Sequence, residues 1–169
     1  MLRCVVRLVF VTLCAVFAAP AMATPSLVTL GGFAPGTIII KQGERSLYLA
    51  LQGGAAIRYP VAVGKAGKAW RGLARVQGKF VNPAWSPPTE VKRDKPWLPD
   101  LIAGGAPNNP MGSHALTLSG GEYAIHGTTR AMRASVGTAA SYGCIRMYNE
   151  DIADLYQRVG VGTPVAVLP

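Results

Sequence analysis

No uninterrupted apolar run in this sequence reaches the roughly 20 residues that a membrane-spanning helix needs. The apolar run from Leu8 to Ala19 is shorter. It follows Arg3 and Arg7 and precedes the small-residue pattern Ala21-Met22-Ala23. This layout predicts a secretory signal peptide over residues 1–23 that is removed from the mature protein. We therefore expect export to the periplasm or cell envelope, with no stable membrane span after cleavage.

Cysteine is also scarce. Of the three cysteines, Cys4 and Cys14 lie in the predicted signal peptide, so the remaining 146 residues contain Cys144 alone. A lone cysteine excludes a disulfide within the mature chain. It leaves three roles: a reactive thiol, half of an intermolecular bridge, or a small buried hydrophobic side chain. The count by itself does not decide among them.

Acidic residues are the third shortage. Eight Asp or Glu residues stand against 17 Lys or Arg residues, which gives a formal net charge of +9, and eight of the basic residues fall from Lys65 to Lys95. For an exported protein this charge does not indicate nucleic acid as a partner. It suits anionic polymers of the envelope or the carboxylates of a substrate. A solvated basic surface accounts for it equally well.

The sequence contains no internal repeat, and its many short apolar segments predict a mainly β domain. One helix is expected over residues 150–159, with Asn149 as its N-cap and Gly160 as its stop. Residues 24–36, rich in Pro, Gly and Thr, form a short lead-in segment. The expected strands span residues 37–41, 46–51, 55–64, 74–81, 115–118, 122–127 and 163–168.

Regular periodicity stops over residues 82–114, where seven of the thirteen prolines fall. A loop of this length in a compact domain is usually a binding loop or a lid, or else it is disordered. Trp85, Trp97 and the apolar side chains that follow Trp97 argue against disorder. We expect an ordered flap beside a cleft.

Cys144 needs a base or a positive field to act as a nucleophile, because a thiol with a pKa near ~8.5 is mostly protonated at neutral pH. The mature chain offers His114 and His126. His126 ends an expected strand 18 residues before Cys144, and the small residues between them allow the chain to fold back. Gly143 permits a tight turn that exposes the thiol, and Arg146 is suited to pair with a substrate carboxylate.

A zinc site is the alternative use of His114, His126 and Cys144. It would make the protein a binding module of the envelope rather than an enzyme. The spacings of 12 and 18 residues match no compact zinc motif, and three ligands are few for a structural site.

The run IHGT (125–128) followed by SYGCIRM (141–147) resembles the signature of the L,D-transpeptidase catalytic domain family (YkuD-like). The similarity extends over roughly residues 37–168, and we expect these residues to form a catalytic domain of that kind. Other segments match in the family's order: YPVAVG (59–64), NPAWSPP (82–88), NNPMGSHAL (108–116), NEDIADLY (149–156) and GTPVAVL (162–168).

The resemblance implies a mixed β-sandwich with a long proline-rich loop, one short helix towards the C-terminus, and no metal or organic cofactor. It implies that Cys144 is the nucleophile. His126 would be the general base and acid, with its ring held by the carbonyl of Gly127. Arg146 would hold a carboxylate of a peptidoglycan stem peptide.

Around the cysteine, the resemblance implies an oxyanion hole made by the backbone N–H groups of Tyr142, Gly143 and Cys144, with Ser141 shaping the turn. The chain departs from the family pattern in two places. Tyr142, which would line the substrate pocket, stands where many members have histidine. The segment AWRGLARVQGKFV (69–81) replaces the family's TPxGxF pattern and alters the loops that face the substrate.

The implied reaction is remodelling of peptidoglycan, which contributes to cell-wall biogenesis and cell shape. The thiolate attacks the carbonyl of the third stem residue, D-alanine leaves, and an amine on a second stem or on an envelope protein resolves the thioester. Hydrolysis of the thioester, as in an L,D-carboxypeptidase, and a non-catalytic peptidoglycan-binding protein remain as alternatives. Sortases place His and Cys much further apart, and papain-like peptidases place Cys before His.

Overall fold

The computed structural model describes residues 25–169, and the predicted signal peptide lies outside the described residues. Within this part of the chain, no helix is both long and apolar enough to cross a membrane. The helices are α1 (Thr89–Asp94) and α2 (Asn149–Arg158), with 3-10 turns at Gln52–Gly54 and Arg130–Ser135. The strands are β1 (Ser26–Thr29), β2 (Ile38–Lys41), β3 (Ser46–Ala50), β4 (Ala55–Pro60), β5 (Val63–Gly64), β6 (Gly72–Val81), β7 (His114–Leu118), β8 (Ala124–His126), β9 (Ala139–Ser141), β10 (Ile145–Arg146) and β11 (Pro164–Leu168).

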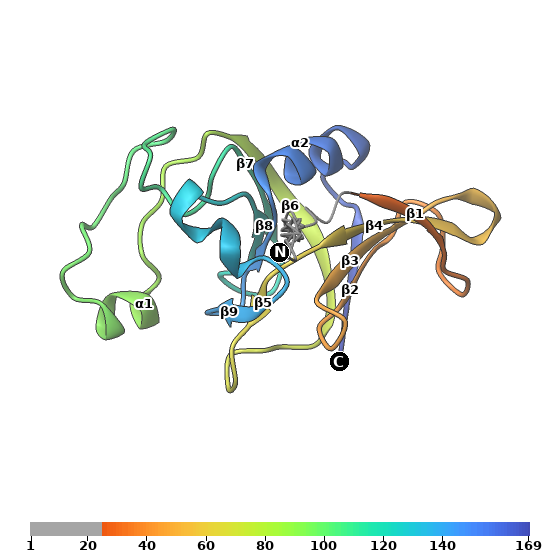
Figure 1. The fold of residues 1–169 in the computed structure, drawn as a ribbon, viewed down its shortest axis with the longest axis horizontal. Coiled ribbons are helices and arrows are strands. Elements are labelled where there is room, and N and C mark those ends of the chain that lie inside the picture. The colour runs from red at the N-terminus through yellow and green to blue at the C-terminus, as the bar shows by residue number, and fades with distance from the viewer. Residues whose placement is uncertain (1–24) are drawn as a thin grey trace, which may run out of the picture.

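The long strand β6 joins the two halves of the main sheet, whose strand order is β1-β4-β3-β2-β11-β6-β7-β8-β10. Its first residues pair with β11, and from Val76 onward it pairs with β7, both antiparallel. A register shift between Val76 and Gly78 marks the change of partner. Figure 1 shows β6 running between the β2–β4 half and the β7–β8 half, with α2 at one end of both. The mixed, mainly β fold expected from the resemblance is confirmed.

One hydrophobic core fills the space between the two halves and the inner face of α2. Alternate residues of each strand face it, as the pleat of a strand requires. In β2, Ile38 and Ile40 belong to this core, whereas Ile39 packs on the outer face against Tyr48. The side chains that close the core from the second half and from α2 are Leu116, Leu118, Ile125, Ile145, Met147, Ile152 and Leu155.

The lead-in segment is more regular than its composition indicated. Residues 26–29 form strand β1, which pairs antiparallel with β4 at the edge of the sheet. Val28, Leu30 and Phe33 then pack on the outer face of the β2–β4 half. The apolar side chains spaced along this segment cover a surface of the sheet that would otherwise be exposed.

The other expected elements are present with small changes. The expected strand at 55–64 is divided into β4 and β5 after Pro60, and the expected helix starts one residue earlier, at Asn149. Tyr148, not Asn149, is the N-cap of α2. Helix α1 and the short strands β9 and β10 were not expected, because each is too short to show a period in the sequence.

Most of the basic residues from Lys65 to Lys95 have partners within the protein. Lys79 donates to the carbonyls of Tyr156 and Val159 at the C-terminal end of α2, where a cation is favoured. Arg75 donates to the carbonyl of Gly162. Lys68 and Arg93 form ion pairs with Glu90, and Lys92 forms one with Asp100.

The side chain of Asn149 holds three segments together instead of capping the helix. Its Oδ1 accepts from the backbone N–H groups of Ser113 (3.1 Å) and Thr128 (2.9 Å), and its Nδ2 donates to the Thr128 carbonyl (3.0 Å). Gly112 and Gly127 flank this amide, and a Cβ on either would collide with Oδ1. These two glycines are therefore required by the close approach of the three segments.

We expect Asn149→Ala to lower the free energy of unfolding by about 2–4 kcal/mol, because it removes three hydrogen bonds and leaves two backbone N–H groups without their acceptor. Asn149→Asp retains the accepting oxygens and should lose less. Urea unfolding followed by tryptophan fluorescence measures both variants. Equal stability of Asn149→Ala and the wild type would contradict this role.

Candidate active site

Cys144 lies in a tight turn between β9 and β10. Ser141 Oγ accepts from the backbone N–H of Gly143 (3.0 Å) and donates to the carbonyl of Cys144 (2.6 Å), so one hydroxyl closes the turn. Gly143 has φ +115°, and a Cβ there would lie 2.6 Å from Cε1 of Tyr123. Glycine is needed at this position for both reasons. The turn-shaping role expected for Ser141 agrees with these contacts.

Two stacked aromatic residues, Trp70 and Tyr123, pack against the cysteine turn. The indole Nε1 of Trp70 donates to the carbonyl of Gly143 (3.0 Å), and its ring stacks on Tyr123 with a centroid distance of 4.6 Å. Sequence reasoning missed both residues. Trp70 belongs to the segment 69–81 that departs from the family pattern, and this departure was the available signal.

His126 stands at the end of β8 and is buried. Its Nδ1 lies 2.8 Å from the carbonyl oxygen of Gly127, the contact expected from the resemblance. Because a carbonyl only accepts, Nδ1 carries the hydrogen in the neutral ring, and Nε2 is left with a lone pair. The ring therefore has the tautomer that a general base at Nε2 requires.

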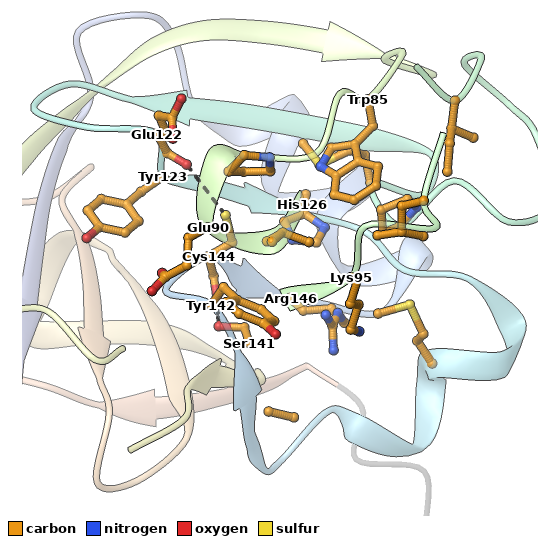
Figure 2. A pocket seen from close by; sticks show the side chains of 18 of the residues that line it. Trp85, Glu90, Lys95, Glu122, Tyr123, His126, Ser141, Tyr142, Cys144 and Arg146 are labelled. Carbon is orange, nitrogen blue, oxygen red and sulfur yellow. Dashed lines mark hydrogen bonds between the residues drawn. The ribbon is translucent and has the colours of Figure 1, made fainter. Parts of the chain in front are cut away.

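The pairing of β8 with β10 brings the predicted site residues together. The two strands are parallel, with Ile145 opposite Ile125 and Arg146 opposite His126. Cys144 precedes Arg146 by two residues and so faces the same side of the sheet. Figure 2 shows the side chains of His126, Cys144 and Arg146 gathered at one cavity.

Burial keeps both reacting groups neutral in the resting site. It lowers the pKa of His126 to about 4, with a further contribution from the nearby Arg146 cation. Burial also raises the pKa of the Cys144 thiol, and the Arg146 charge only partly offsets this effect. The Cys144 Sγ donates to the carbonyl of Glu122 at 3.8 Å. The resting pair is therefore a thiol and a neutral imidazole rather than a thiolate and an imidazolium.

Arg146 is a buried cation with an incomplete set of partners. Its side chain is 8% exposed, and Nη1 donates to Ser135 Oγ at 2.7 Å. Its Nε has no hydrogen-bond partner, and among residues 25–169 no carboxylate forms an ion pair with it. A buried guanidinium in this state is suited to bind a carboxylate from outside.

The flap expected over residues 82–114 is ordered and forms one wall of the cavity. Trp85 and Ile102 exchange backbone hydrogen bonds, and the Asn109 side chain donates to the carbonyls of Pro83 and Ala103. The cavity has a volume of about 460 Å³. Its apolar wall is formed by Trp85, Pro88, Val91, Leu98, Ile102 and Met111.

Tyr142 connects the cysteine turn to the flap. Its hydroxyl donates to Oδ2 of Asp94 at the end of α1 (3.1 Å), and the ammonium of Lys65 lies 3.9 Å from its ring centroid. A second link is the ion pair of Lys68 with Glu90 on α1. Tyrosine at this position thus has a role in holding the flap beside the thiol.

Two further contacts bear on the predicted residues. The backbone N–H of Gly143, one of the three predicted oxyanion-hole donors, donates to Ser141 Oγ. The ring of His114, a ligand in the alternative zinc site, packs against Tyr156 on α2. Across the described part of the chain, no group of three or more His, Cys, Asp or Glu side chains is placed to hold a metal ion.

The model of the YkuD family, the L,D-transpeptidase catalytic domain, matches residues 35–167. The chain belongs to this family. It is 36% identical over 138 residues to the probable L,D-transpeptidase YbiS of Escherichia coli K12, covering 76% of this chain and 43% of YbiS. It is 33% identical over 134 residues to the putative L,D-transpeptidase YkuD of Bacillus subtilis, covering 79% and 66%. The chain thus spans less than half of YbiS and about two thirds of YkuD.

Solved structures agree on the fold. An L,D-transpeptidase from Mycobacterium smegmatis superposes with a TM-score of 0.62 at 19% identity, covering 79% of this chain and 58% of that one. At this identity the likeness concerns the fold alone. A Brucella melitensis protein described as a probable carnitine operon oxidoreductase is 40% identical with a TM-score of 0.57, covering 89% and 96%. Since the names of relatives differ, we base the function on the residues of the site.

The protonated state of Cys144 in this L,D-transpeptidase fold can be measured by alkylation. Because burial raises the thiol pKa, the rate of reaction with iodoacetamide should rise at a higher pH than for free cysteine, near ~8.5. Arg146→Gln removes a cation and should raise the pH of half-maximal alkylation rate (the midpoint) further. Arg146→Lys keeps the charge, and its midpoint should stay near that of the wild type. A wild-type midpoint below that of free cysteine would contradict a neutral resting thiol.

Burial of His126 makes stability depend on pH. Its pKa is about 4 in the native state and 6.5 ordinarily, so between these values the unfolded chain binds a proton that the native ring does not. The free energy of unfolding should therefore fall as the pH drops from about 6.5 to about 4, by up to about 3 kcal/mol from this group. Urea unfolding gives the free energy of unfolding of the wild type and of His126→Gln. The difference between the two values should shrink as the pH falls. A difference that is constant across this range would rule out the effect.

Proposed function

We propose that the protein is an exported cysteine transpeptidase that acts on peptidoglycan stem peptides through a thioester on Cys144. One observation carries the proposal: a thiol, a neutral imidazole and a buried guanidinium open into one cavity from two adjacent parallel strands. Membership of the L,D-transpeptidase family supports it. The predicted signal peptide, residues 1–23, is the basis for export to the periplasm or cell envelope.

Acylation starts from the neutral pair. The S–H of Cys144 turns from the Glu122 carbonyl towards His126, whose Nε2 accepts the proton as sulfur attacks the carbonyl carbon of the third stem residue. The C–S bond forms and the amide C–N bond breaks. The proton passes from His126 to the leaving amine, D-alanine. The bond from Nδ1 to the Gly127 carbonyl holds the ring in place and stabilises its transient positive charge.

Substrate binding uses the groups of the site that lack hydrogen-bond partners within the protein. A stem-peptide carboxylate pairs with Arg146 and satisfies the guanidinium that burial leaves short of acceptors. The backbone N–H groups of Tyr142 and Cys144 stabilise the negative oxygen of the tetrahedral intermediate. The apolar wall of the flap excludes water from the thioester.

The second half of the reaction transfers the acyl group to an amine, on a second stem peptide or on an envelope protein. Attack of the amine forms a new C–N bond, breaks the C–S bond and returns the proton to sulfur through His126. Water in place of the amine would make the same enzyme an L,D-carboxypeptidase. The two outcomes share every residue of the acylation step.

The test is acyl-enzyme formation on purified tetrapeptide, followed by intact-mass spectrometry and product analysis. The wild type should gain the mass of the acyl group, and Cys144→Ala should gain none because the attacking atom is gone. His126→Ala should slow acylation by about 10²–10⁴-fold, the range for loss of a general base. The control is His114→Ala, which removes the other histidine and should acylate at the wild-type rate.

Three results would overturn the proposal. The first is acylation of the Cys144→Ala variant by the tetrapeptide or by a carbapenem. The second is an unchanged rate in a folded His126→Ala variant. The third is a wild-type protein that binds peptidoglycan but forms no acyl-enzyme, which would indicate the non-catalytic alternative.

A further inference from the structure

Two acidic side chains, Glu90 and Glu122, line the cavity, and the mechanism above uses neither of them. Glu90 is neutralised by Lys68 and Arg93, whereas Glu122 takes part in no ion pair within residues 25–169. Glu122 is exposed at the edge of the cavity, on the turn that leads into β8. A cavity that binds carboxylates through Arg146 therefore also carries an unneutralised anion.

Glu122 and Arg146 approach the thiol from different segments. The carbonyl of Glu122, in the bend before β8, accepts from Cys144 Sγ at 3.8 Å, whereas Arg146 follows Cys144 by two residues in β10. Figure 2 shows Cys144 between the two, with the dashed bond from its sulfur to the Glu122 carbonyl.

The two charges also act on the sulfur in opposite directions. The Glu122 carboxylate raises the pKa of the Cys144 thiol, and the Arg146 guanidinium lowers it. Both residues line the cavity into which the thiol opens, so a group bound by either one lies in the same cavity as the thioester.

We propose that Glu122 binds the ammonium group of the acceptor and positions it for attack on the thioester. This inference rests on the proposed function and names its second substrate: a primary amine that arrives as a cation, rather than water. Arg146 serves the carboxylate of the donor on the other side of the sulfur. Glu122 is a positioning residue for the acceptor, and acylation does not depend on it.

The chemistry balances with the groups present. The ammonium enters with three protons, and the attacking amine must lose one of them to solvent before its lone pair is available. The nitrogen then attacks the thioester carbonyl, the C–N bond forms and the C–S bond breaks. A second proton passes from nitrogen through His126 to the Cys144 thiolate. The product is an amide and a free thiol.

The experiment measures how the acyl-enzyme divides between aminolysis and hydrolysis. Wild type and Glu122→Gln are acylated with tetrapeptide and then mixed with an amine that is charged at neutral pH or with hydroxylamine, which is uncharged. Glu122→Gln should lower the aminolysis-to-hydrolysis ratio for the charged amine about two- to fivefold, the range for one exposed ion pair. The ratio for hydroxylamine and the rate of acylation should not change.

Two variants serve as controls. Glu44→Gln removes a carboxylate that lies outside the cavity, where it contacts Lys41 and Tyr48, and should leave the partition ratio unchanged. Glu122→Asp retains the charge and should recover part of the wild-type ratio. A readout that needs no substrate is the alkylation of Cys144, whose midpoint pH should be lower in Glu122→Gln because a neighbouring anion has been removed.

Each contrary result is informative. Normal acylation with an unchanged partition ratio in Glu122→Gln overturns this inference and leaves the proposed function intact. Slower acylation in that variant assigns Glu122 to the donor and also overturns it. An unshifted alkylation midpoint means that the carboxylate lies away from the sulfur. Failure of the wild type to form an acyl-enzyme overturns the proposed function and this inference together.

Discussion

The amide of Asn149 is the constraint on which the site depends. It binds Ser113 and Thr128, which lie in different loops, from the first residue of α2. Gly127, between His126 and Thr128, is packed so closely against this amide that only glycine fits. The carbonyl of Gly127 is therefore fixed, and it in turn fixes the hydrogen on Nδ1 of His126. A single side chain thus joins two loops to the start of a helix. Through Gly127 it also sets which nitrogen of one imidazole carries the hydrogen.

Around this fixed histidine, the site combines a neutral thiol and a neutral imidazole with two charged neighbours. The thiol and the imidazole are buried, and burial opposes ionisation of both. Arg146 and Glu122, on either side of the sulfur, carry the charge instead. In the proposed reaction, charge on the cysteine and histidine develops only as the thiol attacks, inside a cavity with one apolar wall. Such a site is preorganised for a transition state more than for a resting ion pair.

Much of this was predictable because the motifs are local. Residues that touch one another lie within the segment 125–128 and within the segment 141–147. The pairing of β8 with β10 then brings the two segments side by side. What could not be predicted depends on contacts between distant segments. Trp70 supports Gly143 from 73 residues away, and helix α1 is held by Lys68 and Tyr142 rather than by its own sequence. The hydroxyl of Ser141 competes for the Gly143 amide, a detail of geometry that composition does not contain.

The protonated state of Cys144 has a consequence beyond catalysis. Peroxide attacks thiolates, and a thiol whose pKa is raised by burial presents little thiolate to attack. The sulfur is therefore slow to form sulfenic acid while the cavity is empty, and no second cysteine of the described chain is available to trap such a product. In the proposed exported enzyme, Cys144 would thus meet an oxidising environment mainly as a thiol, the form that peroxide attacks slowly.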